Sequence, residues 1–297
     1  MRVNPDFTAD ILTNLWQSQS QVDTALQQIS TGRRVNMPSD DPAAAAADVQ
    51  NQAAQQQTDQ YIQSSSSLEG LLQTADSTLS SVVTALNHAI ALGVQGANGT
   101  LSAADQQAIA QQVQGIRDQV VQLANVSYKG SFIFAGTATT TPPFTLDSTQ
   151  PSGVRYNGNA GTNSVEIAQG RSLQVNLPGA QVFQGSGGDV MASLQQLLTA
   201  LQSGNTTAIG TATTQIRGAL DYLSQQRVFY GNGVNQLTSN QSFLQQEKVN
   251  LQSQENSLVG VDLAKAATDL SKAQTTHNAA LAAVAKVIPQ SLLDYLK

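Results

Sequence analysis

The sequence contains no cysteine, few aromatic residues and few charged residues. Without cysteine, the chain can form no disulfide, no thiolate nucleophile and no cysteine-ligated metal site. Aromatic residues make up 5% of the chain and charged residues 11%, so we expect a thin core built mostly from small side chains. The net charge of -6 gives no basic footprint, so we expect no nucleic-acid partner.

Apolar runs of the kind that enter membranes are also missing. The N-terminal residues Met1 to Asp6 have no apolar stretch, so we expect no Sec signal peptide. We find no uninterrupted apolar run long enough to cross a bilayer, and we expect no membrane partner. These features favour a soluble protein, and they leave open an export route that reads no cleaved signal.

The clearest positive signal is the last 41 residues, Ser257 to Lys297, which are rich in alanine. A mostly apolar series with three-four spacing runs through them: Leu263, Ala267, Leu270, Gln274, His277, Leu281, Val284, Ile288 and Tyr295. A matching series lies near the other end: Ile11, Leu15, Val22, Leu26 and Ile29. Such a stripe is typical of a helix packing along another helix, so we predict that the two termini pair.

Between the termini the period is mostly helical. We predict helices over Thr8–Ser30, Pro42–Gly93, Ser102–Val126 and Asp189–Gln202. Gly32 is a plausible stop for the first helix, because glycine adopts the left-handed conformation at low cost. From Thr206 the period continues into the C-terminal stripe. We predict that Gly231 and Gly233 do not end this helix, because apolar residues keep the period across them.

Between Ser131 and Gly185 the sequence pattern changes from helical spacing to one typical of short strands. The predicted strands are Ser131–Ala135, Gly153–Tyr156, Ser164–Ala168, Ser172–Leu177 and Gln181–Gln184. The glycine-rich residues 185–188 are predicted to be a flexible exit linker. The fold class is therefore mainly α: a long-helix coiled-coil bundle formed by paired N- and C-terminal segments, with a small antiparallel β insertion. We expect this insertion to be dispensable for folding of the helices.

No constellation of catalytic or metal-binding residues is recognisable. The only histidines are His88 and His277, and both lie within predicted helices. Asp40 and Asp41 precede Pro42, where a carboxylate that caps the next helix is a better interpretation than a metal or acid–base pair. We therefore expect a protein that is not an enzyme and that has no catalytic residue, no metal and no cofactor.

Two terminal stretches resemble a known family. Residues 26–42, LQQISTGRRVNMPSDDP, are similar to the N-terminal signature of the bacterial flagellin-like axial proteins, and residues 257–267, SLVGVDLAKAA, to their C-terminal one. Segments 132–137, 141–144, 154–158, 177–183 and 291–296 resemble the members of this family that join the hook to the filament. Gly260 departs from the pattern, because relatives usually carry an acid there.

The resemblance implies three parts: paired terminal helices (1–41 and 257–297) lining an inner tube, a helical bundle domain (42–130 and 186–256), and an outward β knob (131–185). It also makes the connector after the first helix a subunit contact. Our subunit-interface candidates are Leu15, Val22, Leu26, Ile29, Arg33, Arg34, Leu263, Leu270, Leu281, Val284, Ile288 and Leu292.

The partners implied are copies of the same chain in a ring, a neighbouring hook-associated protein on the hook side and flagellin on the filament side. A flagellar export chaperone would bind the C-terminal helix before secretion by the flagellar type III route. Because the terminal seams are narrow and partly polar, we expect both ends to be loosely ordered in the dilute monomer. The alternatives are flagellin itself, the filament subunit, and more remotely a soluble helical adapter or enzyme.

Overall fold

The structure is a computed structural model that describes the backbone of residues 7–295 and the side chains of residues 10–285. The chain separates into two compact units. One consists of Met1–Thr58 with Gln246–Lys297, and the other of Asp59–Gln245. The long helices α2 (Pro42–Gly96) and α6 (Thr206–Val259) contribute to both units.

The predicted helices are confirmed with small shifts at their ends. The structure has α1 (Phe7–Thr31), α3 (Ala103–Ala124), α5 (Val190–Ser203) and α7 (Leu263–Tyr295) besides α2 and α6. Gly32 follows α1 in the left-handed conformation, with φ of 69°. As predicted, α6 continues through Gly231 and Gly233. A break at residues 260–262, which we did not predict, separates α6 from α7.

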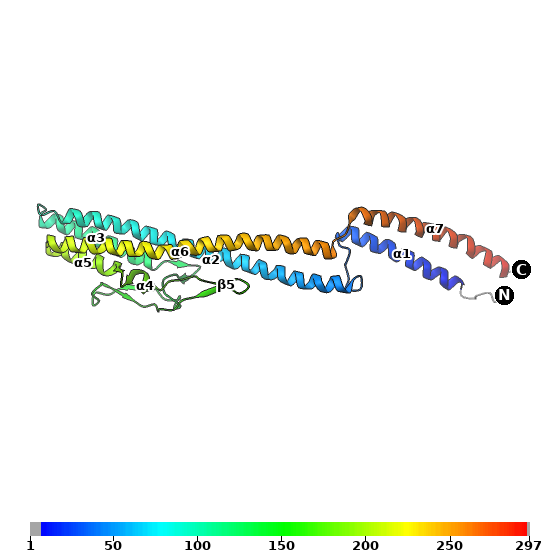
Figure 1. The fold of residues 1–297 in the computed structure, drawn as a ribbon, viewed down its shortest axis with the longest axis horizontal. Coiled ribbons are helices and arrows are strands. Elements are labelled where there is room, and N and C mark those ends of the chain that lie inside the picture. Colours follow the sequence, from blue (N-terminus) through cyan, green and yellow to red (C-terminus); the bar gives the residue numbers. More distant parts are fainter. Residues whose placement is uncertain (1–6, 296–297) are drawn as a thin grey trace. The chain divides into compact units, whose positions relative to one another are not determined.

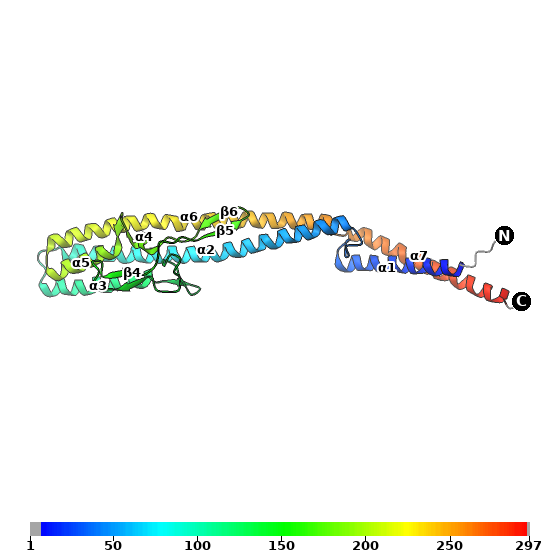
Figure 2. The ribbon, with the colours of Figure 1, turned by 90° about the horizontal axis from the view of Figure 1, so that it is seen from below.

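In the unit formed by Asp59–Gln245, α2, α3, α5 and α6 pack side by side (Figures 1 and 2). Their inward faces carry leucine, valine and isoleucine at helical spacing, and residues such as Leu79, Val113, Leu194 and Ile216 are fully buried. The α3 helix begins with a capping box between Ser102 and Asp105. Apolar residues at helical spacing predict such a buried aliphatic face on each helix.

The β insertion consists of four separate two-stranded antiparallel sheets among the described residues. The pairs are β1 (Ser127–Tyr128) with β2 (Ser131–Phe132), β3 (Phe144–Leu146) with β4 (Val154–Tyr156), β5 (Ser164–Ala168) with β6 (Arg171–Gln174), and β7 (Gln184–Gly185) with β8 (Gly188–Asp189).

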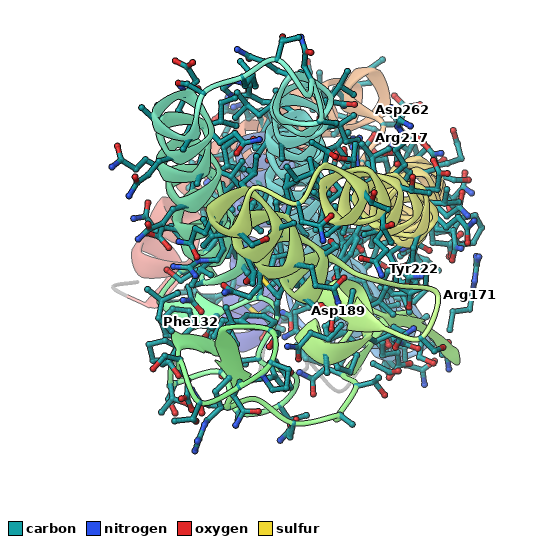
Figure 3. All side chains as sticks on the ribbon, turned by 90° about the vertical axis from the view of Figure 1, so that its left-hand side faces the viewer. Phe132, Arg171, Asp189, Arg217, Tyr222 and Asp262 are labelled. Atoms are coloured by element: carbon teal, nitrogen blue, oxygen red, sulfur yellow. The ribbon has the colours of Figure 1, made fainter. Side chains whose placement is uncertain are left out.

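Three local predictions in this region are wrong. Residues 133–135 form a buried turn and not a strand. The stretch predicted as a strand from Gln181 belongs mostly to the short helix α4 (Gly179–Phe183), which starts directly after Pro178. Residues 185–188 are no loose linker, because they close the β7–β8 hairpin against Tyr222. Figure 3 shows this tyrosine near Asp189, and its hydroxyl donates to the Gln181 carbonyl at 2.8 Å.

The β insertion shares one hydrophobic core with the helices. Phe134, Phe144 and Phe183 are fully or almost fully buried, and so is Tyr230 of α6. Phe134 meets Phe183 and Tyr230 edge-to-face, with ring centroids 5.2 and 6.3 Å apart. This shared core argues against a dispensable insertion, because its deletion would remove three of these rings and expose Tyr230 of α6. Whether the helices fold without the insertion stays a prediction.

By length and composition alone, α2 contains a window that is apolar enough to cross a membrane. Every such window of α2 also contains polar residues, so it is not an uninterrupted apolar run. Nearly half of the window is buried inside the protein, however, and core helices of soluble proteins commonly pass the same test. This one helix therefore gives no support to a membrane partner.

Candidate functional site

The terminal helices form the predicted pair. α1 and α7 run antiparallel beside each other (Figures 1 and 2). The inward positions of α1 follow a strict three-four spacing, and they are Ile11, Leu15, Ser18, Val22, Ala25 and Ile29. Those of α7 follow the same spacing, and they are Ala266, Leu270, Ala273, His277, Ala280 and Val284. Each helix therefore contributes one heptad seam, as in an antiparallel coiled coil.

The predicted C-terminal stripe is only half correct. Positions 270, 277 and 284 face α1 as expected, but the alternate positions are shifted by one residue. Ala266 and Ala273 are buried where we predicted Ala267 and Gln274, which are exposed. Alanine fills the seam because it lets the two backbones approach closely. Three alanines spaced by seven, at 266, 273 and 280, are the sequence signal that we missed.

The large apolar side chains displaced from the seam form an exposed stripe. On α7 it contains Leu263, which is 58% exposed, and Leu281. On α1 it contains Leu12, Leu26 and Trp16, the only tryptophan of the chain, which is 73% exposed. We call these five residues the outer stripe. Single exposed leucines are ordinary, but an apolar series alongside a coiled-coil seam is typical of a helix that contacts a further partner.

The candidate interface residues thus divide into two groups. Leu15, Val22, Ile29, Leu270 and Val284 lie in the intrachain seam, whereas the other described leucines face outward. Ile288 and Leu292 lie outside the residues whose side chains are described. No observation tests a contact between subunits, so their role as interface residues stays a prediction.

The middle of the seam is polar. Ser18 and His277 interrupt the apolar series, and the Ser18 Oγ and His277 Nδ1 atoms are buried without a hydrogen-bond partner in the described structure. A buried polar atom without a partner costs about 1–3 kcal/mol. The α1–α7 pair is therefore less stable than its length suggests, in agreement with the narrow seams noted in the sequence.

Arg33 and Arg34 hold the connector between α1 and α2 in place. The Arg34 N–H donates to the Val259 carbonyl at 2.7 Å, and the Val261 N–H donates to the Gly32 carbonyl at 3.1 Å. These two bonds make an antiparallel bridge between Arg33 and Gly260. Gly260 fits this bridge because an added Cβ would lie 2.3 Å from the Asn256 carbonyl oxygen.

The Arg33 guanidinium forms ion pairs with Asp48 of α2 and Glu255 of α6. Asp48 is only 6% exposed, and its Oδ2 also accepts from the Gln52 amide at 2.9 Å. Arg33 thus neutralises a buried carboxylate and ties the connector to both helices. No short-range sequence signal indicated this role, because Glu255 is distant along the chain. Such an intrachain role does not exclude a subunit contact, which stays a prediction.

Asp41 caps α2, as predicted, whereas Asp40 does not cap a helix but closes a turn of the connector. Asp40 Oδ2 accepts from the backbone N–H groups of Met37 and Asn36, each at 2.9 Å, and these bonds lower its pKa. Asp41 Oδ1 accepts from the Ala44 N–H at 3.0 Å, which lowers the pKa of Asp41 together with the guanidinium of Arg34. Both carboxylates are therefore engaged in hydrogen bonds, and that of Asp41 lies at the start of α2, where negative charge is favoured.

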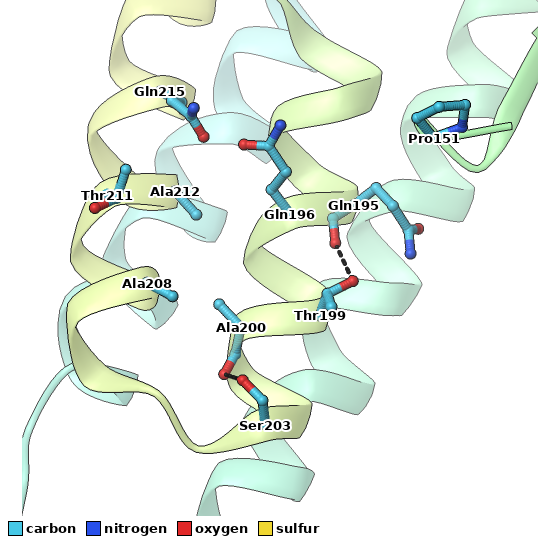
Figure 4. Close-up of a pocket in the computed structure, with 10 residues that line it drawn as sticks. All are labelled: Pro151, Gln195, Gln196, Thr199, Ala200, Ser203, Ala208, Thr211, Ala212 and Gln215. Atoms are coloured by element: carbon cyan, nitrogen blue, oxygen red, sulfur yellow. Dashed lines mark hydrogen bonds between the residues drawn. The ribbon is translucent and has the colours of Figure 1, made fainter.

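A groove of about 480 Å³ lies between α5 and α6 (Figure 4). Its lining is uncharged and consists mainly of amide, hydroxyl and alanine side chains. Two of the hydroxyls are occupied locally, because Thr199 donates to the Gln195 carbonyl and Ser203 to the Ala200 carbonyl. The groove holds no acid–base pair. Within the described residues, there is no group of three metal-ligating side chains.

Comparison with known families agrees with the helical pair. The family model "Bacterial flagellin N-terminal helical region" matches residues 7–139, and "Bacterial flagellin C-terminal helical region" matches residues 209–296. Together the two models cover most of the chain, including α1 and α7. The chain therefore belongs to the bacterial flagellin family.

Within that family the chain is similar to flagellar hook-associated protein 3. It is 37% identical to the protein of Escherichia coli over 158 residues, which are 53% of this chain and 48% of that protein. It is 36% identical to the protein of Salmonella typhimurium over 173 residues, which are 58% and 53% of the two chains. The matched stretches thus span about half the length of these relatives.

Solved structures show the same fold. A putative flagellar hook-associated protein from Vibrio parahaemolyticus matches with a TM-score of 0.69 and 20% identity, over 74% of this chain and all of that chain. Bacillus cereus FlgL matches with a TM-score of 0.59 and 24% identity, over 71% and 99% of the two chains. At these identities the likeness concerns the fold, and it confirms a mainly α chain with a small β insertion.

Proposed function

We propose that the chain is a structural subunit of the bacterial flagellum that joins the hook to the filament. The similarity to flagellar hook-associated protein 3 supports this proposal most directly. The terminal helix pair supports it independently, because the apolar side chains of the outer stripe are exposed in the part of the chain that the structure describes. On this proposal the protein is not an enzyme, it needs no cofactor, and it is located outside the cell in the flagellar axis.

The assembly would form by repeated contacts between one surface of a subunit and another surface of the next, as closed rings and helical tubes require. The paired termini (1–41 and 257–297) would line the inner tube, residues 42–130 with 186–256 would form the surrounding layer, and residues 131–185 would face outward. The neighbours would be a hook-associated protein on the hook side and flagellin on the filament side.

Before secretion by the type III route, we propose that an export chaperone covers the outer stripe of α7. The termini would be loosely ordered in dilute monomer and become fully helical in the assembly. The polar centre of the seam, at Ser18 and His277, supports such a weak intrachain pair. Limited proteolysis of the monomer tests this: trimming should stop near residues 40 and 260, whereas two resistant termini would refute it.

A deletion strain tests the main proposal. Loss of the gene should leave intact hooks, no motility and flagellin shed into the medium, and the wild-type gene should restore filaments. Hooks without filaments and without shed flagellin would instead identify the chain as the filament subunit.

A second experiment tests the outer stripe. Complementation with Leu263→Ser and Leu281→Ser should fail to restore filaments, although the secreted variant keeps its helical circular dichroism. Val94→Ser is a matched control, because Val94 has a similar exposed fraction on α2 in the other unit. It should restore motility. If the Leu263 and Leu281 variant also restores motility, the outer stripe is not an assembly surface.

A further inference from the structure

The sequence contains three Asn-Gly dipeptides, at residues 98–99, 157–158 and 232–233. In such a dipeptide the glycine backbone nitrogen can attack the asparagine side-chain carbonyl with little steric hindrance, because glycine has no Cβ. The reaction needs a local backbone that is free to bring the two groups together. The structure places the three dipeptides in very different surroundings.

Asn98 and Gly99 lie in the exposed turn that connects α2 to α3. The Leu101 N–H donates to the Asn98 carbonyl at 3.2 Å, so Gly99 is a central residue of a tight turn. Apart from its two chain neighbours, no residue has an atom within 4 Å of the position that a Cβ on Gly99 would take. The Gly99 N–H has no hydrogen-bond partner among the described residues. The attacking nitrogen is thus open and unbound.

The side-chain carbonyl of Asn98 is also polarised. Its Oδ1 accepts a hydrogen bond from the Thr100 Oγ at 3.0 Å and a longer one from the Thr100 N–H at 3.3 Å. When a nitrogen adds to this carbonyl, negative charge develops on Oδ1. Donors that already point at such an oxygen stabilise the transition state, as an oxyanion hole does.

At the other two dipeptides, surrounding residues restrict the movement of the asparagine or the glycine. Asn157 donates its side-chain amide to the Thr145 hydroxyl at 3.0 Å, and an added Cβ on Gly158 would lie 2.8 Å from the Ala135 carbonyl oxygen. Asn232 lies inside α6, where the Gly233 N–H takes part in the helix hydrogen bonds and Gly233 itself is buried. In α6 the backbone nitrogen cannot approach the side chain without local unfolding, and at Asn157 the side-chain hydrogen bond must break first.

We propose that Asn98 is a site of spontaneous covalent modification, promoted by Thr100. The Gly99 nitrogen loses its proton to solvent and bonds to the Asn98 Cγ. The side-chain nitrogen takes up a proton from solvent, its bond to Cγ breaks, and it leaves as ammonia, which gives a five-membered cyclic imide. Water then opens the imide to aspartate or isoaspartate. No oxidant or reductant is needed, and either product adds one negative charge to the α2–α3 turn.

The test is incubation of the full-length protein at neutral pH, followed by chymotryptic digestion and tandem mass spectrometry of all three sites. Folded protein should convert Asn98 at least about tenfold faster than Asn157 or Asn232, because local unfolding limits those two sites. In urea the three rates should become similar. An equal or faster rate at Asn157 or Asn232 in the folded protein would overturn the proposal, as would a preference for Asn98 that persists unchanged in urea.

Thr100→Val tests the role of the hydroxyl, and Thr100→Ser is the matched control that keeps the donor. The valine variant should slow conversion of Asn98 about 2- to 10-fold, the rate equivalent of one lost hydrogen bond. The serine variant should convert at nearly the wild-type rate. If valine and serine behave alike, Thr100 does not promote the reaction, and that part of the proposal is wrong.

Discussion

The two glycines that α6 passes through give a sharp test of the packing. Gly231 and Gly233 are two residues apart in one helix, but an added Cβ on Gly231 would meet no atom within 4 Å. A Cβ on Gly233 would lie 2.7 Å from Cδ1 of Leu72, which is fully buried in α2. Alanine is favoured over glycine by about 1 kcal/mol in a helix interior. Gly231→Ala should therefore raise the free energy of unfolding by about that amount.

Gly233→Ala has the same propensity gain, but it forces a methyl group into a packed core. Such overpacking typically costs about 1–3 kcal/mol, so the net change should lie between zero and a loss of about 2 kcal/mol. The two variants should thus differ by about 1–3 kcal/mol, the size of the overpacking cost alone. Urea unfolding followed by far-ultraviolet circular dichroism measures this difference.

A Leu72→Ala variant tests whether the contact with Leu72 causes the cost of Gly233→Ala. With Leu72 truncated, the Gly233 substitution should lose most of its penalty, because contacting residues couple in a double-mutant cycle. If Gly233→Ala stabilises the wild-type protein as much as Gly231→Ala, the close approach of α2 and α6 at this point is not a real constraint. If Gly233→Ala lowers the free energy of unfolding equally with and without the Leu72 side chain, the strain does not come from the contact with Leu72.

Three further outcomes follow from the ion pairs, caps and seam. Arg33→Ala should lower the free energy of unfolding by about 1–3 kcal/mol, since it leaves the buried Asp48 short of a partner. Arg34→Ala, which removes a more exposed pair, should cost less than about 1 kcal/mol in the same urea titration. Burial raises the pKa of Asp189, which caps α5 through the Ala192 N–H. A raised carboxyl pKa favours the folded state below the ordinary value of 3.8, and this contribution is lost as pH rises through the raised pKa. Asp189→Asn, which keeps a capping oxygen, should therefore raise the thermal midpoint at neutral pH and lose this advantage in acid, and a midpoint difference independent of pH would contradict this. Ser18→Ala should stabilise the α1–α7 pair by about 1 kcal/mol by removing a buried unpaired hydroxyl, measured as slower proteolysis of the termini. The exposed Ser20→Ala reports helix propensity alone, and equal effects at the two positions would refute the polar-seam argument.

The helices were predictable from sequence because their apolar period is local and long. The continuity of α6 through its two glycines followed from the period of the neighbouring apolar residues, which outweighs a weak propensity. The break at residues 260–262 was not predictable in the same way. It depends on the bridge between Arg33 and Gly260, whose two partners are far apart in sequence.

The interface residues were only partly predictable. Hydrophobicity alone ranks Leu263 and Leu281 above Ala266 and Ala273, so a pattern reading assigns the leucines to the nearest seam. The structure reverses this order, because backbone approach favours alanine and leaves the leucines outside. Which of two adjacent stripes on a helix faces the partner helix can therefore be decided only when that partner is known.

The sequence predicted where the β insertion lies and that it is made of strands, but not how it packs against the helices. Strand alternation at Ser164–Ala168 was correct, since β5 covers the same residues. The pattern could not indicate that Phe134 packs against Tyr230 of α6, because alternation gives a face and not a partner. The available hint was that five aromatic residues of an aromatic-poor chain fall within the insertion: Phe132, Phe134, Phe144, Tyr156 and Phe183.

The bridge between Arg33 and Gly260 has a mechanical consequence. Two chain crossings connect the α1–α7 pair to the ends of α2 and α6, and each crossing alone would act as a swivel about its own backbone bonds. Hydrogen bonds between the crossings and the ion pairs of Arg33 couple the two, so that rotation of one must carry the other. Torque applied to the terminal pair is therefore transmitted through a double-stranded joint, whose torsional stiffness depends on Arg33.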